Sequence, residues 1–263
     1  MPPLRVLILG GAGEAAALAD DLAGDGRFEP TLSLAGRTGA PRLPVIAWRI
    51  GGFGGVPGLV RFLGENGVQA LIVATHPFAA QMRRHAVEAV RAVRMPLAMI
   101  ERPAWLPGAG DDWTMVADMQ QAALALGPDP RRVLLTIGRK DLAPFVGAPW
   151  HAYVVRSVDA PPPESLPPGA EMIAARGPFD EQAERQLLID RHIEVIVTKN
   201  SGGAAVEAKL RAARGLGLPV IMIERPAAPD LRGLAVTTVT DAAAALNWLW
   251  TLHQTVSDAE RGV

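Results

Sequence analysis

A glycine-rich turn near the N-terminus has the composition of a phosphate-binding loop. The segment Gly10-Gly11-Ala12-Gly13-Glu14 directly follows the apolar run from Leu4 to Leu9, and an alanine-rich stretch of helical length comes next. Small residues at such a strand-to-helix turn let backbone N–H groups and a helix N-terminus approach a phosphate. The turn departs from the spacing G-x-G-x-x-G, so a tight turn without a ligand is the alternative interpretation.

The end of the next predicted strand indicates which dinucleotide would bind. Sites selective for NAD place an acidic residue about 20 residues after the glycine turn, where it accepts from the ribose 2′-OH. Here the strand ends in Ser33-Leu34-Ala35-Gly36-Arg37-Thr38, so a guanidinium and a hydroxyl replace the carboxylate. Arg37 and Thr38 suit a 2′-phosphate and predict NADPH. The alternative is that Arg37 is a solvated loop residue.

Two further turns of the first half follow predicted strands. Gly51-Gly52-Phe53-Gly54-Gly55 offers bare backbone that can pass close to a ribose or nicotinamide, although a flexible loop is a competing interpretation. Thr75-His76-Pro77-Phe78 ends the strand predicted from Ala70. Pro77 suits an early helix position. His76 is a candidate general acid or cofactor contact, with a purely structural histidine as the alternative.

Cations replace small residues at the corresponding turns of the second half. Gly138-Arg139-Lys140-Asp141 stands in place of the glycine turn, and Lys199-Asn200-Ser201-Gly202-Gly203 in place of the Thr-His-Pro-Phe turn. Such a cluster attracts a polyanionic ligand, although each cation alone is better explained as a surface charge. The candidate substrate-binding residues are Arg139, Lys140, Arg176, Gly177, Lys199, Asn200, Ser201, Gly202 and Gly203.

Composition excludes several other classes of chemistry. The 263 residues include no cysteine, which rules out a disulfide scaffold, a thiolate metal site and a cysteine nucleophile. With 26 basic and 27 acidic residues, a general binder of nucleic acid or membrane surfaces is not expected. The five histidines have no metal-ligand spacing, so no metal is predicted. Without an apolar run of membrane-spanning length or a leader sequence, a soluble cytoplasmic protein is expected.

These turns must be held by the carboxyl ends of parallel strands. Short apolar runs alternate with alanine-rich segments along the whole chain, which predicts an α/β protein with crossover helices. The expected strands are 4–9, 31–35, 45–49, 70–74, 97–100, 133–136, 152–157, 171–175, 195–197 and 220–223. One helix is expected to begin near residue 14. The other expected helices are 56–66, 79–93, 181–191 and 203–215.

An internal repeat divides the chain into two similar halves. The segment Met95 to Ala104 recurs as Leu218 to Ala227 at an offset of 123, with a shared Met-Ile-Glu-Arg-Pro-Ala string. At the same offset Thr114-x-Val116-x-Asp118 matches Thr237-x-Val239-x-Asp241, and each aspartate is a candidate helix cap. We therefore predict two Rossmann-like, doubly wound domains, 1–130 for NADPH and 131–263 for substrate, with the ligands in a cleft between them.

Several motifs together resemble the precorrin-6A reductase family of cobalamin (vitamin B12) biosynthesis. They occur in the family's order over nearly the whole chain, and one departure is Ala12, where many members carry threonine. The motifs are Leu9-Gly10-Gly11-x-x-Glu14-Ala15, Ser33-Leu34-Ala35-Gly36-Arg37-Thr38, Gly51-Gly52-Phe53-Gly54-Gly55, Ala74-Thr75-His76-Pro77-Phe78-Ala79, Ala175-Arg176-Gly177-Pro178-Phe179 and Lys199-Asn200-Ser201-Gly202-Gly203.

The resemblance implies a reaction and a substrate. The family reduces the C18–C19 double bond of precorrin-6A, a tetrapyrrole-derived macrocycle with several carboxylates, and the product is precorrin-6B. It also implies two Rossmann-like domains that exchange a strand, which would blur a boundary at residue 130. We expect hydride delivery to C19 from a nicotinamide near residues 51–53 and 75–78, with Lys199 as the candidate catalytic residue for protonation or electrostatic activation.

Other functions remain compatible with the residues. One is a two-domain sensor that binds a nucleotide or tetrapyrrole without chemistry, because a fold does not define an activity. Another is a reductase of a different polycarboxylate, which includes cobalt-precorrin-6A. The sequence does not predict the oligomeric state.

Overall fold

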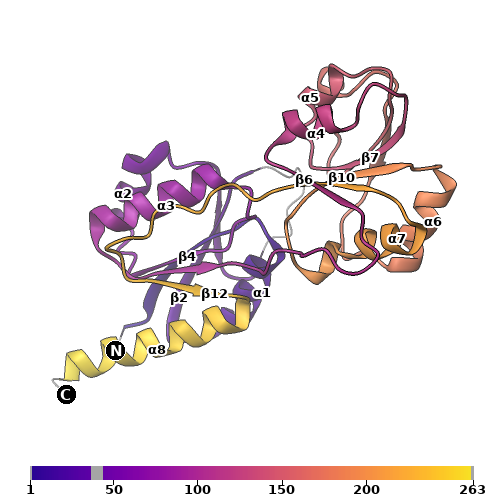
Figure 1. The fold of residues 1–263 in the computed structure, drawn as a ribbon. Helices are drawn as coiled ribbons and strands as arrows, with labels where there is room; N and C mark the ends of the chain where they lie inside the picture. Colours follow the sequence, from indigo (N-terminus) through magenta and orange to yellow (C-terminus); the bar gives the residue numbers. More distant parts are fainter. Residues whose placement is uncertain (1, 37–43, 262–263) are drawn as a thin grey trace. The chain divides into compact units, whose positions relative to one another are not determined.

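A computed structural model describes residues 2–36 and 44–261 of the chain. It divides them into two compact units, each built around one six-stranded sheet (Figure 1). The first unit joins Met1–Arg102 to Ala227–Val263, and the second is Pro103–Pro226.

The sheet of the first unit is parallel throughout, and its strand order is β12-β5-β4-β1-β2-β3. The strand order reverses beside β1, as in a doubly wound fold, so the predicted fold class is confirmed. The strands are β1 (Leu4–Leu9), β2 (Phe28–Leu34), β3 (Ala47–Ile50), β4 (Ala70–Val73), β5 (Leu97–Ile100) and β12 (Val236–Val239).

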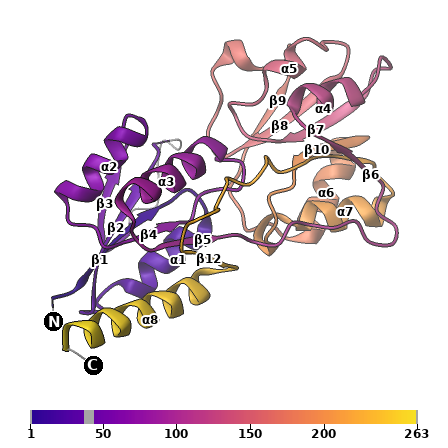
Figure 2. The same cartoon turned by 60° about the vertical axis from the view of Figure 1, so that its left-hand side comes forward.

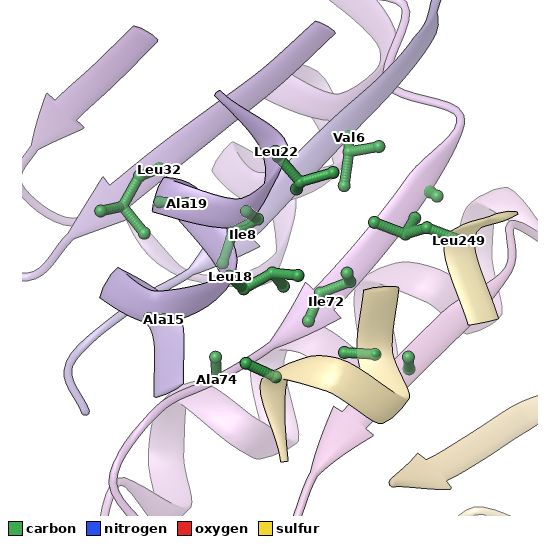
Figure 3. Close-up of a cluster of buried hydrophobic side chains, with 14 of the residues drawn as sticks. Val6, Ile8, Ala15, Leu18, Ala19, Leu22, Leu32, Ile72, Ala74 and Leu249 are labelled. Carbon is green, nitrogen blue, oxygen red and sulfur yellow. The ribbon is translucent and has the colours of Figure 1, made fainter. Parts of the chain in front are cut away.

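Helices cover both faces of this sheet because its central strands are apolar on both sides. On one face lie α1 (Gly13–Leu22) and α8 (Ala242–Arg261), and on the other α2 (Gly55–Glu65) and α3 (Ala80–Val93) (Figure 2). Figure 3 shows how Leu18 and Leu22 of α1 and Leu249 of α8 meet Ile8 and Ile72 of the sheet.

The second unit repeats this architecture with the order β6-β11-β10-β7-β8-β9. Helices α6 and α7 bury one face of its sheet in an apolar core. Its strands are β6 (Trp113–Val116), β7 (Arg132–Thr136), β8 (Ala152–Ser157), β9 (Glu171–Ala174), β10 (Val195–Lys199) and β11 (Val220–Ile223). Its helices are α4 (Met119–Ala125), α5 (Ala143–Val146), η1 (Pro163–Ser165), α6 (Glu181–Asp190), η2 (Ala204–Val206) and α7 (Ala208–Leu216).

The two units exchange their sixth strands. Strand β6 follows β5 in sequence but pairs with β11 of the second sheet, whereas β12 follows β11 and pairs with β5 of the first. The pairing registers are equivalent, because Val220 lies opposite Trp113 and Leu97 opposite Val236. The strand exchange implied by the family resemblance is thus present.

The exchange corrects the boundary expected near residue 130. That position lies inside the second unit, and the chain crosses between units at 102/103 and again at 226/227. Sequence periodicity did not mark β6 and β12 as strands because both are largely exposed edge strands. Their following caps were predicted correctly: Asp118 accepts from Gln121 N and Asp241 from Ala244 N, each at 2.8 Å.

Candidate functional site

The reversal of strand order lies between β1 and β4 in the first unit and between β7 and β10 in the second. We call these positions the first and second switch points. Ligands of doubly wound sheets bind outside the carboxyl ends of the strands at such points. Each predicted turn can therefore be placed relative to its own switch point.

The first switch point brings together two of the predicted turns. Gly10 to Ala12 follows β1, and Thr75 to Phe78 follows β4. A Cβ on Gly11 would lie 3.9 Å from the His76 backbone nitrogen, and Gly11 has a positive φ of 148° that favours glycine. The sequence-predicted glycine turn and the Thr-His-Pro-Phe turn are therefore neighbours.

The N-terminus of α1 is open at this edge. Its N-cap residue Ala12 makes no side-chain cap hydrogen bond within the described chain, and a Cβ on Gly13 would have no described atom within 4 Å. The first N–H groups of a helix lack intrahelical acceptors and carry partial positive charge. This end of α1 is thus suited to an anionic oxygen, as the sequence predicts.

Thr75 adds a buried polar group that has no partner within the described part of the chain. The residue is 8% exposed, and Oγ1 has no hydrogen-bond partner among the described residues. Leaving a buried hydroxyl unsatisfied costs about 1–3 kcal/mol. A ligand at the first switch point would satisfy it, so the residues present fit a dinucleotide with its phosphates on α1.

Glu14 lies in the first turn of α1, and sequence reasoning missed its partner. Arg102 Nη1 lies 3.3 Å from Glu14 Oε1, and both side chains are largely buried. The arginine offsets a carboxylate that would otherwise repel a phosphate at the same helix end. Arg102 was recognisable as part of the repeated Ile-Glu-Arg-Pro string, but the repeat alone assigned it no role.

The glycine turn after β3 occupies the neighbouring part of the same sheet edge. Gly51, Gly54 and Gly55 all have positive φ values, and a Cβ on Gly58 of α2 would lie only 1.6 Å from the Phe53 carbonyl oxygen. Gly58 therefore permits a close approach between α2 and this turn, a role that the sequence did not indicate. Arg37 and Thr38, the predicted 2′-phosphate contacts, lie outside the described residues.

His76 is used within its own turn. Its Nδ1 accepts a hydrogen bond from the Phe78 backbone N at 3.2 Å, and the two rings are 5.7 Å apart. Pro77 is buried and precedes α3 by three residues. The predicted role of His76 as a cofactor contact stays a prediction, and Nδ1 serves the turn.

Ionic groups face each other across the second switch point. Lys199 Nζ at the end of β10 donates to Asp141 Oδ2 at 2.6 Å. Arg139 Nη1 lies 4.0 Å from Asp159 Oδ2. Lys140 and Arg176 are exposed. Asp141, which belongs to the predicted turn, and Asp159 thus lie among the predicted cations, whose role in substrate binding stays a prediction. The charges are neighbours because β7 and β10 are adjacent strands.

The rest of the predicted Lys199–Gly203 segment is tightly packed. The Asn200 side chain accepts from Trp105 N and donates to Trp105 O, both at 2.9 Å, and Ser201 is buried. A Cβ on Gly202 would lie 2.2 Å from the Pro103 carbonyl oxygen. These contacts anchor the start of the second unit, and the substrate contacts predicted for this segment remain predictions.

A buried ionic cluster in the second unit has no counterpart among the predicted residues. Arg156 and Glu184 form a two-point ion pair with side chains 5% and 4% exposed. Next to them, burial lowers the pKa of Lys209 to about 7, with a further contribution from the Arg156 charge. Lys209 donates to Val206 O at 2.6 Å and lies 4.9 Å from the Trp105 ring. Helical periodicity does not reveal that such residues face a core.

Comparison with known proteins accounts for both units together. The family model described as precorrin-6x reductase CbiJ/CobK matches residues 5–250. The chain belongs to this family. A member from Rhodobacter capsulatus, a precorrin-6A reductase, is 52% identical over 86% of this chain and 89% of its own length. A solved structure of this family, CobK precorrin-6A reductase, has a TM-score of 0.87 at 48% identity and covers 95% of this chain and 97% of that one.

More distant relatives include a cobalt-precorrin-6A reductase from Priestia megaterium. It is 34% identical over 63% of this chain and 68% of its own length. The family therefore includes proteins named for both a metal-free and a cobalt-containing substrate. No helix within the described part of the chain has the length and hydropathy required to cross a membrane.

Proposed function

We propose that this protein reduces precorrin-6A to precorrin-6B with NADPH, as a cytoplasmic step of cobalamin biosynthesis. Family membership supports the reductase chemistry. The structural observation that carries the proposal is the first switch point, where the glycine turn that leads into α1 lies next to Thr75, whose buried Oγ1 has no partner among the described residues. No amino-acid side chain donates a hydride, so such a reduction needs a separate hydride donor.

The first unit would hold the dinucleotide. The N–H groups of Gly13 and Glu14 would bind its phosphates, Thr75 would bind a neighbouring polar group, and Arg37 with Thr38 would bind the 2′-phosphate. When bound, the reduced nicotinamide supplies a hydride to C19 of the substrate. The protein's task is then to orient the two reactants and exclude competing acceptors, which makes positioning its main contribution.

The second unit would bind the carboxylates of the substrate. Arg139, Lys140 and Arg176 supply charge-assisted donors for acetate and propionate groups. Lys199 would donate the proton that C18 requires once C19 has received the hydride, so that two electrons and two hydrogens reduce the double bond. Asp141, 2.6 Å from Lys199 Nζ, holds the ammonium in place before the substrate binds.

The direct test combines purified protein, NADPH and precorrin-6A. We expect loss of NADPH absorbance that depends on the macrocycle, together with formation of precorrin-6B. Binding of both molecules without NADPH oxidation would instead support a sensor. NADPH oxidation with another polycarboxylate, and none with precorrin-6A, would show that the enzyme acts on a different substrate.

Two variants test the assigned residues. Lys199→Ala under single turnover should slow the reduction at saturating substrate; a change in substrate affinity alone would make Lys199 only a carboxylate contact. Arg37→Ala should weaken NADPH far more than NADH. Equal losses for the two dinucleotides would contradict the 2′-phosphate assignment.

Cobalt-precorrin-6A is the second candidate substrate, because family members carry that name. The higher identity and coverage of the relatives named for precorrin-6A favour the metal-free macrocycle. Comparing kcat/KM for the two macrocycles decides between them. A preference for the cobalt form would reverse this assignment and leave the hydride chemistry unchanged.

A further inference from the structure

We propose that Arg49 is a positioning residue for the dinucleotide, because it shapes the Gly51–Phe53 turn so that two backbone N–H groups face the ligand. The inference rests on the function proposed for the first unit. Arg49 is the second-last residue of β3, and Ile50 separates it from the turn.

The guanidinium of Arg49 connects the turn to the neighbouring strand. Nη1 donates to Ser33 Oγ at 2.8 Å and to the Gly51 carbonyl at 3.0 Å, and Nη2 donates to the Gly52 carbonyl at 3.0 Å. Ser33 is buried near the end of β2 and is the register partner of Arg49. One side chain therefore links the ends of β2 and β3.

Two aromatic rings hold the guanidinium in place. Its central carbon is 4.0 Å from the centroid of Phe53 and 5.3 Å from that of Phe62, and the two rings pack edge to face at 5.2 Å. Partial burial lowers the pKa of Arg49, but an arginine keeps its charge at physiological pH. The side chain is thus a fixed cation with a defined orientation.

A backbone hydrogen bond from the Gly51 N–H to the Leu34 carbonyl, at 2.8 Å, also restrains the start of the turn. A Cβ on Gly51, Gly52 or Gly54 would have no described atom within 4 Å, so packing does not order these residues. Ordering the backbone of each residue costs about 1–2 kcal/mol in conformational entropy. The hydrogen bonds from Arg49 to two consecutive carbonyls offset that cost in the part of the turn that has no side chains.

The same bonds determine where the N–H groups of the turn point. In a trans peptide the carbonyl and the following N–H point in opposite directions. With the carbonyls of Gly51 and Gly52 directed at Arg49, the N–H groups of Gly52 and Phe53 point away from it. Neither donates to another backbone group within the described chain. They are therefore available to a ribose or phosphate oxygen at the carboxyl edge of the sheet.

The test compares Arg49→Met with Arg27→Met. Arg27 also contacts two rings, Phe28 and Trp250, but it precedes β2 and so lies at the opposite, amino end of that strand. Calorimetric titration with NADPH and with NADH, kcat and KM, and the thermal midpoint are measured for each protein. Ser33→Ala, which removes one Arg49 contact at small structural cost, serves if Arg49→Met does not fold.

We expect Arg49→Met to weaken NADPH and NADH alike by about tenfold and to raise KM with little change in kcat. Arg49→Lys, with one ammonium in place of the two-pronged donor, should recover thermal stability but only part of the affinity. Arg27→Met should bind as the wild type does, and Ser33→Ala should show a smaller loss.

Unchanged dinucleotide affinity in Arg49→Met, or in Ser33→Ala where that variant replaces it, would overturn the positioning role. A loss confined to NADPH would overturn it too, and would assign Arg49 to the 2′-phosphate itself. Failure of the wild-type protein to bind either dinucleotide would refute the proposed function of the first unit, and with it this assignment. Weaker dinucleotide binding by Arg49→Met, with normal binding by the wild type, would support both the proposed function and the positioning role. Normal binding by both proteins would refute the positioning role alone.

Discussion

The two switch points have the same strand topology, but different chemical groups lie at them. In the first unit, backbone groups of the glycine turn lie at the carboxyl edge next to Thr75, whose hydroxyl has no partner among the residues that the structure describes. In the second unit, the Lys199–Asp141 ion pair spans the same position, and Asn200 is engaged by Trp105. A shared fold thus offers hydrogen-bond donors to a phosphate in one copy and fixed charges to a carboxylate in the other.

Equivalent arginines of the repeat show how this divergence arises. Arg102 neutralises Glu14 at the helix end of the first switch point, whereas Arg225 donates through Nε to the Asn200 carbonyl at 2.9 Å. The two arginines have the same place after their strands, but their neighbours differ. The role of a repeated residue is therefore determined by the turn that it meets.

The largest expected effect concerns the buried charges of the second unit. Glu184→Gln leaves Arg156 buried without its counter-ion and should lower the free energy of unfolding by about 3–5 kcal/mol. The matched change Glu29→Gln, at the exposed Arg5–Glu29 pair of the first unit, should cost about 1 kcal/mol or less. Urea unfolding measures the free energy of unfolding of both variants. Equal losses would contradict the expected difference between the buried and the exposed ion pair.

The pH dependence of stability should also distinguish the second unit. Burial depresses the pKa of Lys209 to about 7, below its unfolded value, so the unfolded chain binds more protons between that pH and about 10.5. Stability should therefore rise with pH in this window, by at most about 1.4 kcal/mol per pH unit from this group. Lys209→Met should abolish that rise and be more stable than the wild type near pH 6. An unchanged pH profile would show that Lys209 is not the source.

Replacing a glycine by alanine should have different effects in the two units, at the packed Gly202 of the second and at the open Gly13 of the first. Gly202→Ala places a Cβ against the Pro103 carbonyl at a positive φ, so we expect a loss of about 1–3 kcal/mol in unfolding free energy. Gly13→Ala meets no described atom and should leave stability within about 1 kcal/mol of wild type. Its added methyl should still weaken NADPH binding. Similar stability losses in both variants would show that the two turns are equally packed.

The smallest effect separates binding from folding at the first switch point. Thr75→Val keeps the shape of the side chain and removes the unpartnered hydroxyl, so stability should stay equal or increase. NADPH affinity should fall by about three- to tenfold if a ligand uses Oγ1. Calorimetry and thermal unfolding report the two quantities independently. Wild-type affinity would leave Thr75 outside the binding site.

Much of the architecture follows from local patterns in the sequence. Continuous apolar runs such as Leu97–Ile100 and Val220–Ile223 are strands with the predicted bounds, because strands covered on both faces need apolar residues at every position. The repeat at an offset of 123 and the caps Asp118 and Asp241 are likewise readable from residue order. The positions of the predicted turns at strand ends follow from the same alternation.

Long-range pairing decides the features that residue order leaves open. Strands β6 and β12 share a threonine and a valine at equivalent positions, so residue order does not show which sheet each one joins. The Glu14–Arg102 pair, the Lys199–Asp141 pair and the Arg49–Ser33 hydrogen bond join residues 16 to 88 positions apart. Their chemistry depends on distance and burial, which the sequence does not encode locally and which arise when the strands assemble.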